Sequence, residues 1–302
     1  MNQLKISIII VNWNGYTDTY ECLKSLEKVS RKNLQIIIVD NGSDNNDFIK
    51  LESEFQGFKL IRSESNLGFT GGNNLGIKYA LEIESDFIML LNNDTVVTPN
   101  FINPLLKVFE KNKNAGIVAP IINYFDERDK IWSSGGKINK LRGAGISNPA
   151  LVTQQDNLSE VKVEFVSGCC MLIPSSVFKK VGLFDDSYFL YSEDTDLCFR
   201  VIKNNYEIFI SKDSLIYHKA KSSTKNELSV LALYYETRNR LYFIKKNYPK
   251  YLIITMFYII VTMTIKSIIW FFNGKPNYIQ VVIRSFSDFL KGNLGKSSFV
   301  NH

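Results

Sequence analysis

The stretch "LKISIIIVNW" (residues 4–13) is an apolar run rich in β-branched residues, and "TYECLKSLEKV" (residues 19–29) follows it with helical spacing of apolar positions. The first is typical of one buried strand and the second of an amphipathic helix. The unit recurs, with apolar runs at 34–40, 58–62, 86–94 and 115–120 and helical patterns at 46–56, 71–83 and 99–112. Strands that alternate with helices predict a parallel sheet buried on both faces. We expect an α/β fold that is doubly wound over the first 120 residues.

The alternation stops after this region. Residues 121–160 contain several glycines and the polar stretch "TQQDNLSE" (residues 153–160), which predicts irregular hairpins and an exposed loop. Beyond them we expect a strand at 163–167, a helix starting near Pro174, an acidic helix from 193 and strands near 206–218. The predicted organisation is one domain over residues 1–245 and a helical tail over residues 246–302.

Composition limits the class of protein. The chain has 302 residues, of which 45% are hydrophobic and 22% charged, so it can bury a substantial core. The cysteines have no metal-ligand spacing and are expected to be buried, reduced thiols; they are Cys22, Cys169, Cys170 and Cys198. The start of the chain does not resemble a signal peptide, which favours the cytoplasmic side.

The net charge of +6 is concentrated at the end of the chain. From Arg240 onward, nine Lys or Arg residues accompany one acid, Asp288. A basic end among apolar segments points to anionic lipid rather than to nucleic acid. Residues 251–272 are long and apolar enough to cross a bilayer, although Lys266 leaves open whether they span it or lie in its interface. Residues 278–292 have the pattern of an amphipathic helix, for which we expect a place on the cytoplasmic face of the membrane.

Three carboxylates are crowded in "FLYSEDTDLCFR" (residues 189–200): Glu193, Asp194 and Asp196. They have two explanations. Acids favour a helix start, where Ser192 would be the cap, and acids among apolar residues also suit an acid/base site.

Polar residues also follow two of the predicted strands. Asp40 ends the second strand, and Asn92, Asn93 and Asp94 end the fourth. Ligands of open α/β sheets bind at the carboxyl ends of strands, so these side chains are candidates for a site. Between them, Gly71 and Gly72 would expose backbone amides at a helix start, which suits a diphosphate.

Over residues 5–245 these features resemble the nucleotide-sugar glycosyltransferases of the GT-A fold, and within them the inverting family-two type that includes bacterial rhamnosyltransferases. The motifs that carry the resemblance are "VNWNG" (11–15), "VDNGSDN" (39–45), "NLGFTGGNN" (66–74), "LLNNDT" (90–95), "SGCCMLI" (167–173), "FDDSYFLYSEDTDLCFR" (184–200), and His218 with Ser222 and Ser223. The resemblance implies a GT-A mixed sheet flanked by helices, with the C-terminal tail added to it.

The resemblance also assigns donor and metal sites. Asp40 would accept a hydrogen bond from the base of the donor nucleotide, among further donor-binding residues Val11, Asn12, Asn66, Gly71, Asn73 and Asn93. Asn92 and Asp94 occupy the family's D-x-D metal motif, where asparagine departs from the pattern, and His218 resembles its metal-side histidine. Oxygen ligands of this kind suit Mg²⁺ or Mn²⁺.

Asp194 matches the family's catalytic base, which takes the proton of the attacking acceptor hydroxyl. Glu193 and Asp196 would bind the acceptor or order the helix start. Arg238 would face the diphosphate or be a solvated charge.

The expected function is transfer of a sugar from a nucleotide-sugar donor to a saccharide acceptor in bacterial cell-surface polysaccharide synthesis. The resemblance favours dTDP-L-rhamnose and leaves UDP-hexoses open, and the basic tail favours a lipid-linked acceptor. Oligomerisation stays open. The alternatives are a sugar nucleotidyltransferase, which normally has a basic Gly-rich loop after the first strand, and an inactive membrane-bound glycan-binding relative. A processive synthase would need several spanning helices.

Overall fold

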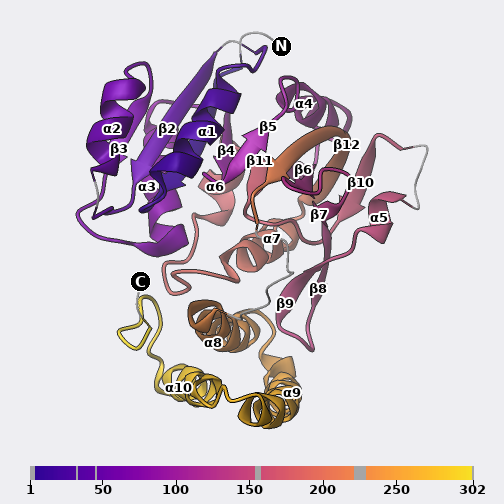
Figure 1. The fold of residues 1–302 in the computed structure, drawn as a ribbon. Coiled ribbons are helices and arrows are strands. Elements are labelled where there is room, and N and C mark those ends of the chain that lie inside the picture. Colours follow the sequence, from indigo (N-terminus) through magenta and orange to yellow (C-terminus); the bar gives the residue numbers. More distant parts are fainter. Residues whose placement is uncertain (1–3, 32, 45, 154–157, 221–228, 301–302) are drawn as a thin grey trace.

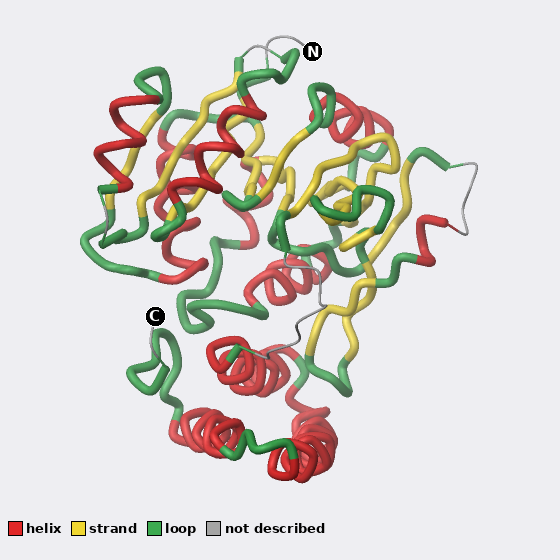
Figure 2. Tube along the Cα trace, viewed as in Figure 1, coloured by secondary structure: helices red, strands yellow, loops and turns green. Residues whose placement is uncertain are grey.

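The structure is a computed structural model that describes residues 4–31, 33–44, 46–153, 158–220 and 229–300. A twisted sheet has helices on both faces, and the C-terminal helices form a further layer below it (Figure 1). Figure 2 shows the strands enclosed between helices. The expected α/β class with a mixed sheet is therefore confirmed.

The strands are β1 (Ile6–Asn12), β2 (Leu34–Asp40), β3 (Lys59–Arg62), β4 (Phe87–Leu91), β5 (Thr95–Val97), β6 (Ala115–Tyr124), β7 (Ile131–Ser133), β8 (Gly136–Asn139), β9 (Ala144–Ser147), β10 (Glu160–Val163), β11 (Cys170–Pro174) and β12 (Glu207–His218). The helices are α1 (Tyr16–Leu26), α2 (Asp47–Glu54), α3 (Gly68–Glu82), α4 (Ile102–Lys111), α5 (Ala150–Thr153), α6 (Ser175–Val181), α7 (Glu193–Lys203), α8 (Val230–Asn247), α9 (Leu252–Phe272) and α10 (Asn277–Lys291), with a 3₁₀ turn at Pro249–Tyr251.

The main sheet has the order β10-β12-β6-β11-β4-β1-β2-β3, with β5 paired to β12 and β7 to β6. The pairs among β4, β1, β2 and β3 are parallel, as the alternating pattern predicts. Strand β11 runs antiparallel to β4 on one side and to β6 on the other. Strands β8 and β9 form a separate hairpin.

Alternation along β1 divides the core between the two faces of the sheet. Ile8 and Ile10 pack on the face covered by α1, α2 and α4, whereas Ile9 packs on the face covered by α3, α6 and α7. The described cysteines are free and buried, as expected. An apolar strand flanked by helices on both faces is what the run at residues 4–13 predicts.

Several sequence expectations need correction. The strand expected at 163–167 is β10, which ends at Val163, and beyond it only Phe165 forms an isolated bridge, to Gly136. The strands expected near 206–218 are a single strand, β12, with a register shift between Ser211 and Leu215. The exposed loop expected at 153–160 lies largely outside the described residues, since 154–157 are not described.

Helices α8, α9 and α10 share an apolar core of their own, which includes Leu233, Ile259 and Val281. The tail is therefore packed on α8 rather than separate from the rest. The apolar stripe expected to lie on a membrane is divided: Val282 is buried, whereas Ile283 and Leu290 are exposed. The domain boundary expected between residues 245 and 246 falls within α8.

The close packing of α3 on β1 gives a stability prediction. A Cβ at Gly76 would lie 2.4 Å from Cγ2 of Ile9, a fully buried side chain with no room to move. We expect Gly76→Ala to destabilise the fold by about 1–3 kcal/mol because of overpacking.

Chemical denaturation of the wild type and the variant measures this. The control is Gly57→Ala, because a Cβ at Gly57 meets nothing within 4 Å. Equal stability of Gly76→Ala and wild type would show that α3 can shift away from β1.

Candidate active site

The register of β1 and β2 places Asn12 opposite Asp40 at the carboxyl ends of the two strands. Oδ1 of Asp40 accepts from the Asn12 amide at 3.3 Å and from the Ser43 hydroxyl. Its Oδ2 is buried and has no hydrogen-bond partner among the described residues. A buried, unpaired carboxylate oxygen is unusual in proteins and fits an atom that awaits a ligand N–H.

Asn12 supports Asp40 rather than facing a ligand. Its amide nitrogen also donates to Ser43 (3.1 Å) and Asp47 (3.2 Å), and its carbonyl accepts from Thr19 (2.7 Å). Because the side chain is fully buried and its hydrogen bonds are made inside the protein, its role is to fix the strand ends.

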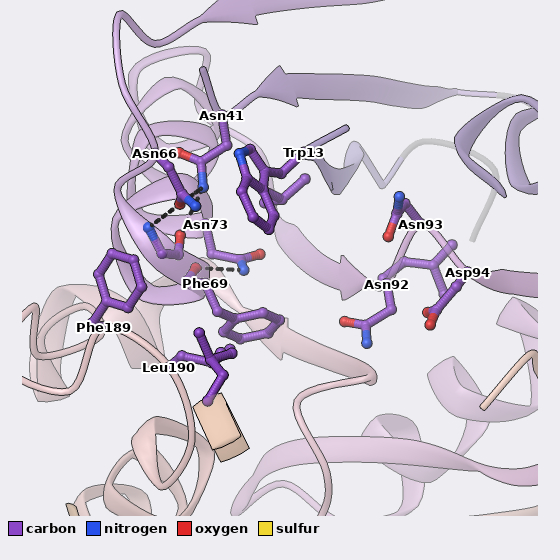
Figure 3. A pocket seen from close by; sticks show the side chains of 14 residues that line it. Trp13, Asn41, Asn66, Phe69, Asn73, Asn92, Asn93, Asp94, Phe189 and Leu190 are labelled. Atoms are coloured by element: carbon purple, nitrogen blue, oxygen red, sulfur yellow. Dashed lines mark hydrogen bonds between the residues drawn. The ribbon is translucent and has the colours of Figure 1, made fainter. Parts of the chain in front are cut away.

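A cavity of about 260 Å³ opens beside these strand ends. Figure 3 shows Asn41, Asn66 and Asn73 on one side of it and the turn with Asn92, Asn93 and Asp94 on the other. The expected site residues that line it are Val11, Asn66, Asn73, Asn92, Asn93 and Asp94. Asn12, Asp40 and Gly71 are not among its lining residues.

Asparagines shape the wall formed by the start of α3. Asn41 donates to Oδ1 of Asn66 (3.2 Å) and to the Gly68 carbonyl (3.0 Å), and Oδ1 of Asn66 accepts from the Gly68 amide (2.8 Å). Gly68 has φ +73°, and a Cβ there would lie 2.3 Å from the carbonyl oxygen of Phe189. Only glycine fits this position, which holds α3 against the loop before α7.

The two glycines expected to present amides to a diphosphate do not line the cavity. α3 begins at Gly68, earlier than expected, so Gly72 lies beyond its first four amides. A Cβ on Gly72 would meet Val11 at 2.8 Å, and one on Gly71 would meet Leu67 at 2.5 Å. These glycines allow close packing, and the first residues of α3, Gly68 and Phe69, line the cavity instead.

The expected metal residues meet at the other side of the cavity. Pairing of β5 with β12 sets His218 opposite Thr95, and Nε2 of His218 lies 3.0 Å from Oδ1 of Asp94. This Asp94 oxygen is buried and contacts Nε2 of His218, whereas Nδ1 of His218 is buried without a hydrogen-bond partner among the described residues. Ser222 and Ser223, which follow His218 in the family pattern, lie outside the described residues.

These atoms fit a divalent cation. No group of three or more His, Cys, Asp or Glu that could hold a metal occurs in the described part of the chain. Mg²⁺, however, is commonly held by one or two carboxylates together with substrate phosphates and water, so Asp94 with a diphosphate donor would suffice. The buried Asp94 oxygen, 3.0 Å from a ring nitrogen of His218, is the observation that supports this fit, because both atoms are possible metal ligands.

Asp194 is not among the residues that line this cavity, but it lies close to Gly168, which packs against the lining residue Phe69. Its Oδ2 accepts from the Gly168 amide (3.2 Å) and its Oδ1 from the Thr195 amide (2.6 Å). A Cβ on Gly168 would lie 3.1 Å from the ring of Phe69, a cavity wall, and 3.5 Å from Cβ of Asp194. The carbonyl of the next residue, Cys169, accepts from the Asn92 amide at 2.9 Å, which links the segment that holds Asp194 to the turn of Asn92, Asn93 and Asp94.

Burial changes the proton affinity of the two neighbouring acids. Burial raises the pKa of Glu193 well above its usual range, and the charge of Asp194 raises it further. Burial also raises the pKa of Asp194, while the amides of Gly168 and Thr195 partly oppose this. Oε2 of Glu193 has no hydrogen-bond partner among the described residues. A raised pKa makes Asp194 a stronger base than an exposed aspartate.

Ser192 does not cap α7 as expected. It occupies the residue before the helix in a left-handed conformation (φ 72°), and its side chain makes no capping hydrogen bond. Phe189 and Tyr191 also have positive φ. The amide of Asn239 on α8 holds this loop by donating to the carbonyls of Tyr188 (2.9 Å), Leu190 (2.8 Å) and Tyr191 (2.9 Å).

Asp196 and Arg238 lie inside the protein. Asp196 is fully buried and accepts from Arg200 (2.8 Å), Tyr188 (3.2 Å) and Asn247 (2.9 Å), which indicates an ordering role. Arg238 is only 1% exposed, so it is not a solvated charge. It donates to backbone carbonyls of Tyr188 and Asn293 and is not among the residues that line the cavity.

Trp13, Asn41, Phe69 and Asn239 were not identified from the sequence. The first three line the cavity. The sequence did contain a signal for Trp13, because a large aromatic residue directly after a predicted buried strand suits contact with a ligand. In the structure this side chain is 39% exposed, which agrees with that signal. The sequence contained no signal for Asn239, because its role is to donate hydrogen bonds to a loop about fifty residues earlier in the chain.

Comparison with known proteins identifies the family. The family description "Glycosyl transferase family 2" matches residues 7–182, more than half of the chain. The chain belongs to this family. A curated relative, the low-salt glycan biosynthesis hexosyltransferase Agl10 of Haloferax volcanii, is 28% identical over 237 residues, which cover 78% of this chain and 74% of the relative.

Two further similarities extend the comparison. The N-acetylglucosaminyl-diphospho-decaprenol L-rhamnosyltransferase of Mycobacterium tuberculosis is 25% identical over 253 residues (77% of this chain, 82% of the relative). A solved structure of GalNAc-T7 with UDP, GalNAc and Mn²⁺ matches with a TM-score of 0.64 at 15% identity and covers 80% of this chain. This chain spans 48% of that protein. The expected family and GT-A fold are therefore confirmed: the chain is a family 2 glycosyltransferase, and one of its relatives is named a rhamnosyltransferase.

The buried acid Glu193 gives a prediction on stability against pH. Its folded pKa lies above the ordinary value of 4.5, so the neutral form is favoured in the folded state. The free energy of unfolding of the wild type should therefore fall as the pH rises above about 4.5. The total loss is about 1.4 kcal/mol for each unit by which the pKa of Glu193 in the folded state exceeds that in the unfolded state. Glu193→Gln cannot ionise and should lose less.

Thermal unfolding of both proteins at pH 5 and pH 8 measures this effect. The advantage of Glu193→Gln over the wild type should increase with pH. The same substitution at Glu52, which is exposed on α2, is the control and should give a constant difference. If the stability difference between Glu193→Gln and the wild type is equal at both pH values, Glu193 does not have a raised pKa in the folded protein.

Proposed function

We propose that this glycosyltransferase transfers a sugar, with inversion at the anomeric carbon, from a nucleoside-diphosphate sugar to a lipid-linked saccharide of the bacterial cell surface. The proposed donor is dTDP-L-rhamnose. The observation that carries the proposal is the position of Asp194, a buried carboxylate held by the Gly168 amide next to Phe69, which lines the cavity. The rhamnosyltransferase name of the M. tuberculosis relative supports the donor, and the hexosyltransferase name of the H. volcanii relative keeps UDP-hexoses as the alternative.

The chemistry needs one base. The acceptor oxygen forms a bond to the anomeric carbon, the bond from that carbon to the diphosphate oxygen breaks, and the hydroxyl proton passes to Asp194. The amides of Gly168 and Thr195 fix the orientation of the carboxylate. Attack opposite the leaving diphosphate inverts the configuration.

The donor would lie across the cavity. The exposed ring of Trp13 lines the cavity and would cover the nucleoside. Oδ2 of Asp40 is buried at the adjoining strand end, outside the lining residues, and would accept from a pyrimidine N–H that reaches it. Asp94, with Asn92 and His218 beside it, would hold a divalent cation. When bound, that ion would supply positive charge to the diphosphate as it leaves.

The proposed location is the cytoplasmic face of the cell membrane, either peripheral or with a single span. Residues 249–272 form one helical stretch long and apolar enough to cross a bilayer, and little of it is buried. The large apolar residues that α9 exposes are Ile253, Ile254, Phe257, Ile260, Val261, Ile265, Ile268, Ile269, Phe271 and Phe272. An exposed apolar surface of this extent favours lipid, and the basic tail favours anionic headgroups.

The role of Asp194 is tested by substitution. Asp194→Asn should bind the donor normally and lower turnover by about a hundredfold or more, because the general base is lost. Glu193→Gln is the matched control and should have a milder effect. The assay is release of nucleoside diphosphate from a panel of nucleotide sugars that includes dTDP-L-rhamnose and UDP-hexoses.

Near-normal transfer by Asp194→Asn would remove this residue from the mechanism. Failure of the wild type to transfer or hydrolyse any donor would favour the inactive glycan-binding alternative.

Metal dependence is tested separately. Activity should require a divalent ion, and Asp94→Ala should weaken donor binding about tenfold or more, because the diphosphate loses its neutralising partner. Calorimetric titration with the nucleoside diphosphate, with and without Mg²⁺ or Mn²⁺, measures this. Asp213→Ala, at an exposed position of β12, is the control. Full activity in excess chelator would contradict the metal site.

A further inference from the structure

A second cavity, of about 490 Å³, lies between the β8–β9 hairpin and helices α8 and α9. Arg142 and Gly145 line it from the hairpin, Arg240 from α8, and Tyr258 and Lys266 from α9. The cavity is separate from the donor cavity, with which it shares no lining residue. None of the roles proposed above uses it.

The charges around this cavity favour an anion. Three cations line it, and one carboxylate, Glu236, pairs with Arg240 at 3.2 Å. Arg142 and Lys266 are exposed and form no ion pair within the described part of the chain. Like charges that converge on one space repel each other unless a negative group lies between them, and arginine binds phosphate oxygens with matching geometry.

Its position relates the cavity to the active site. The amide of Gly145, which lines the cavity, donates to Oγ1 of Thr195 at 3.2 Å. Thr195 in turn donates to the carboxylate of Asp194. A Cβ on Gly145 would lie 2.1 Å from the ring of Phe165, so only glycine lets the hairpin pack in this way. One residue, Thr195, therefore connects the lining of this cavity to Asp194, the proposed catalytic base.

The other side of the cavity faces the apolar helix. Lys266 is the one charged residue in α9, and three large apolar residues near it in the chain are exposed: Ile265, Ile268 and Ile269. The hairpin is fixed to the same helix, because Thr255 donates to the carbonyl of Lys140 at 2.9 Å. A molecule with an apolar chain on α9 and a negative group at Lys266 would extend its other end toward Asp194.

We propose that this cavity binds the phosphate or diphosphate group of the lipid that carries the acceptor saccharide. The proposal rests on the proposed function, since it names the part of the acceptor that a lipid-linked substrate would present. It also accounts for a lysine within an otherwise apolar helix, because the ammonium group compensates the lipid's negative charge at the membrane boundary.

The test is vesicle flotation of the full-length protein without any donor. Three kinds of phosphatidylcholine vesicle are compared: with a polyprenyl diphosphate, with phosphatidylglycerol at equal surface charge, and with an uncharged polyprenol. The wild type should prefer the diphosphate vesicles to both others. The double variant Arg142→Gln/Lys266→Gln should lower this preference about tenfold, because two charge-assisted contacts are lost.

The control is Lys250→Gln/Lys291→Gln, which removes the same charge from exposed tail positions outside the cavity. It should weaken binding to both kinds of anionic vesicle equally and keep the preference for the diphosphate. Circular dichroism and thermal unfolding verify that each variant is folded, and the exposed positions of Arg142 and Lys266 make this the expected result.

Two outcomes would overturn the proposal. One is a wild type without preference for the diphosphate over phosphatidylglycerol, which would mean that bulk headgroups are bound. The other is a cavity variant that keeps the wild-type preference. Flotation needs no turnover, so a wild type that selects the diphosphate vesicles but uses no nucleotide sugar would refute the proposed transfer and leave the lipid site standing.

Discussion

The hydrogen bonds from Asn239 to the loop before α7 are the constraint on which the active site depends. One buried side-chain amide donates to three backbone carbonyls, and Arg238 adds a fourth contact, to the carbonyl of Tyr188 at 3.3 Å. The loop contains three non-glycine residues with positive φ, a conformation that costs about 1–3 kcal/mol at each position. Such a loop persists only where its surroundings hold it. The carboxylates of Glu193 and Asp194 follow directly, so their placement depends on α8.

This constraint joins the helical layer to the catalytic sheet. Asp196 on α7 accepts from Asn247 on α8 and forms an ion pair with Lys246 at 3.0 Å. On its other side, α8 is held to α10 by the hydrogen bond from Tyr234 to Asp288 (2.7 Å). The C-terminal helices are therefore attached to the active site through buried polar contacts. Removal of one hydrogen-bond partner from such a contact lowers the free energy of unfolding, because the other partner stays buried and unpaired. Two buried acids beside each other are a further cost, which suits a site arranged for proton transfer rather than for stability.

The sequence predicted what depends on local pattern. The βα alternation identified β1 to β4 and α1 to α4, because the central parallel strands β1, β2 and β4 are mainly apolar and buried, while the edge strand β3 retains a short apolar run. It missed β11, which is placed between β4 and β6 by pairing with residues about eighty positions away. It also assigned Ser192 a capping role that the contacts of Asn239 override. Amphipathic spacing found α10 but could not tell what covers its apolar face, since α8 and a lipid surface require the same pattern.

The β8–β9 hairpin connects helix α7 to helix α9 through hydrogen bonds. Its Gly145 amide donates to Thr195 beside Asp194, the proposed base, and its Lys140 carbonyl accepts from Thr255 near the start of α9. Under the proposed contact of α9 with a membrane, this connection would hold Asp194 at a constant height above the lipid. A saccharide built on a lipid raises its terminal hydroxyl by one sugar at each addition. A constant height would then make the length of the proposed acceptor part of what the enzyme recognises.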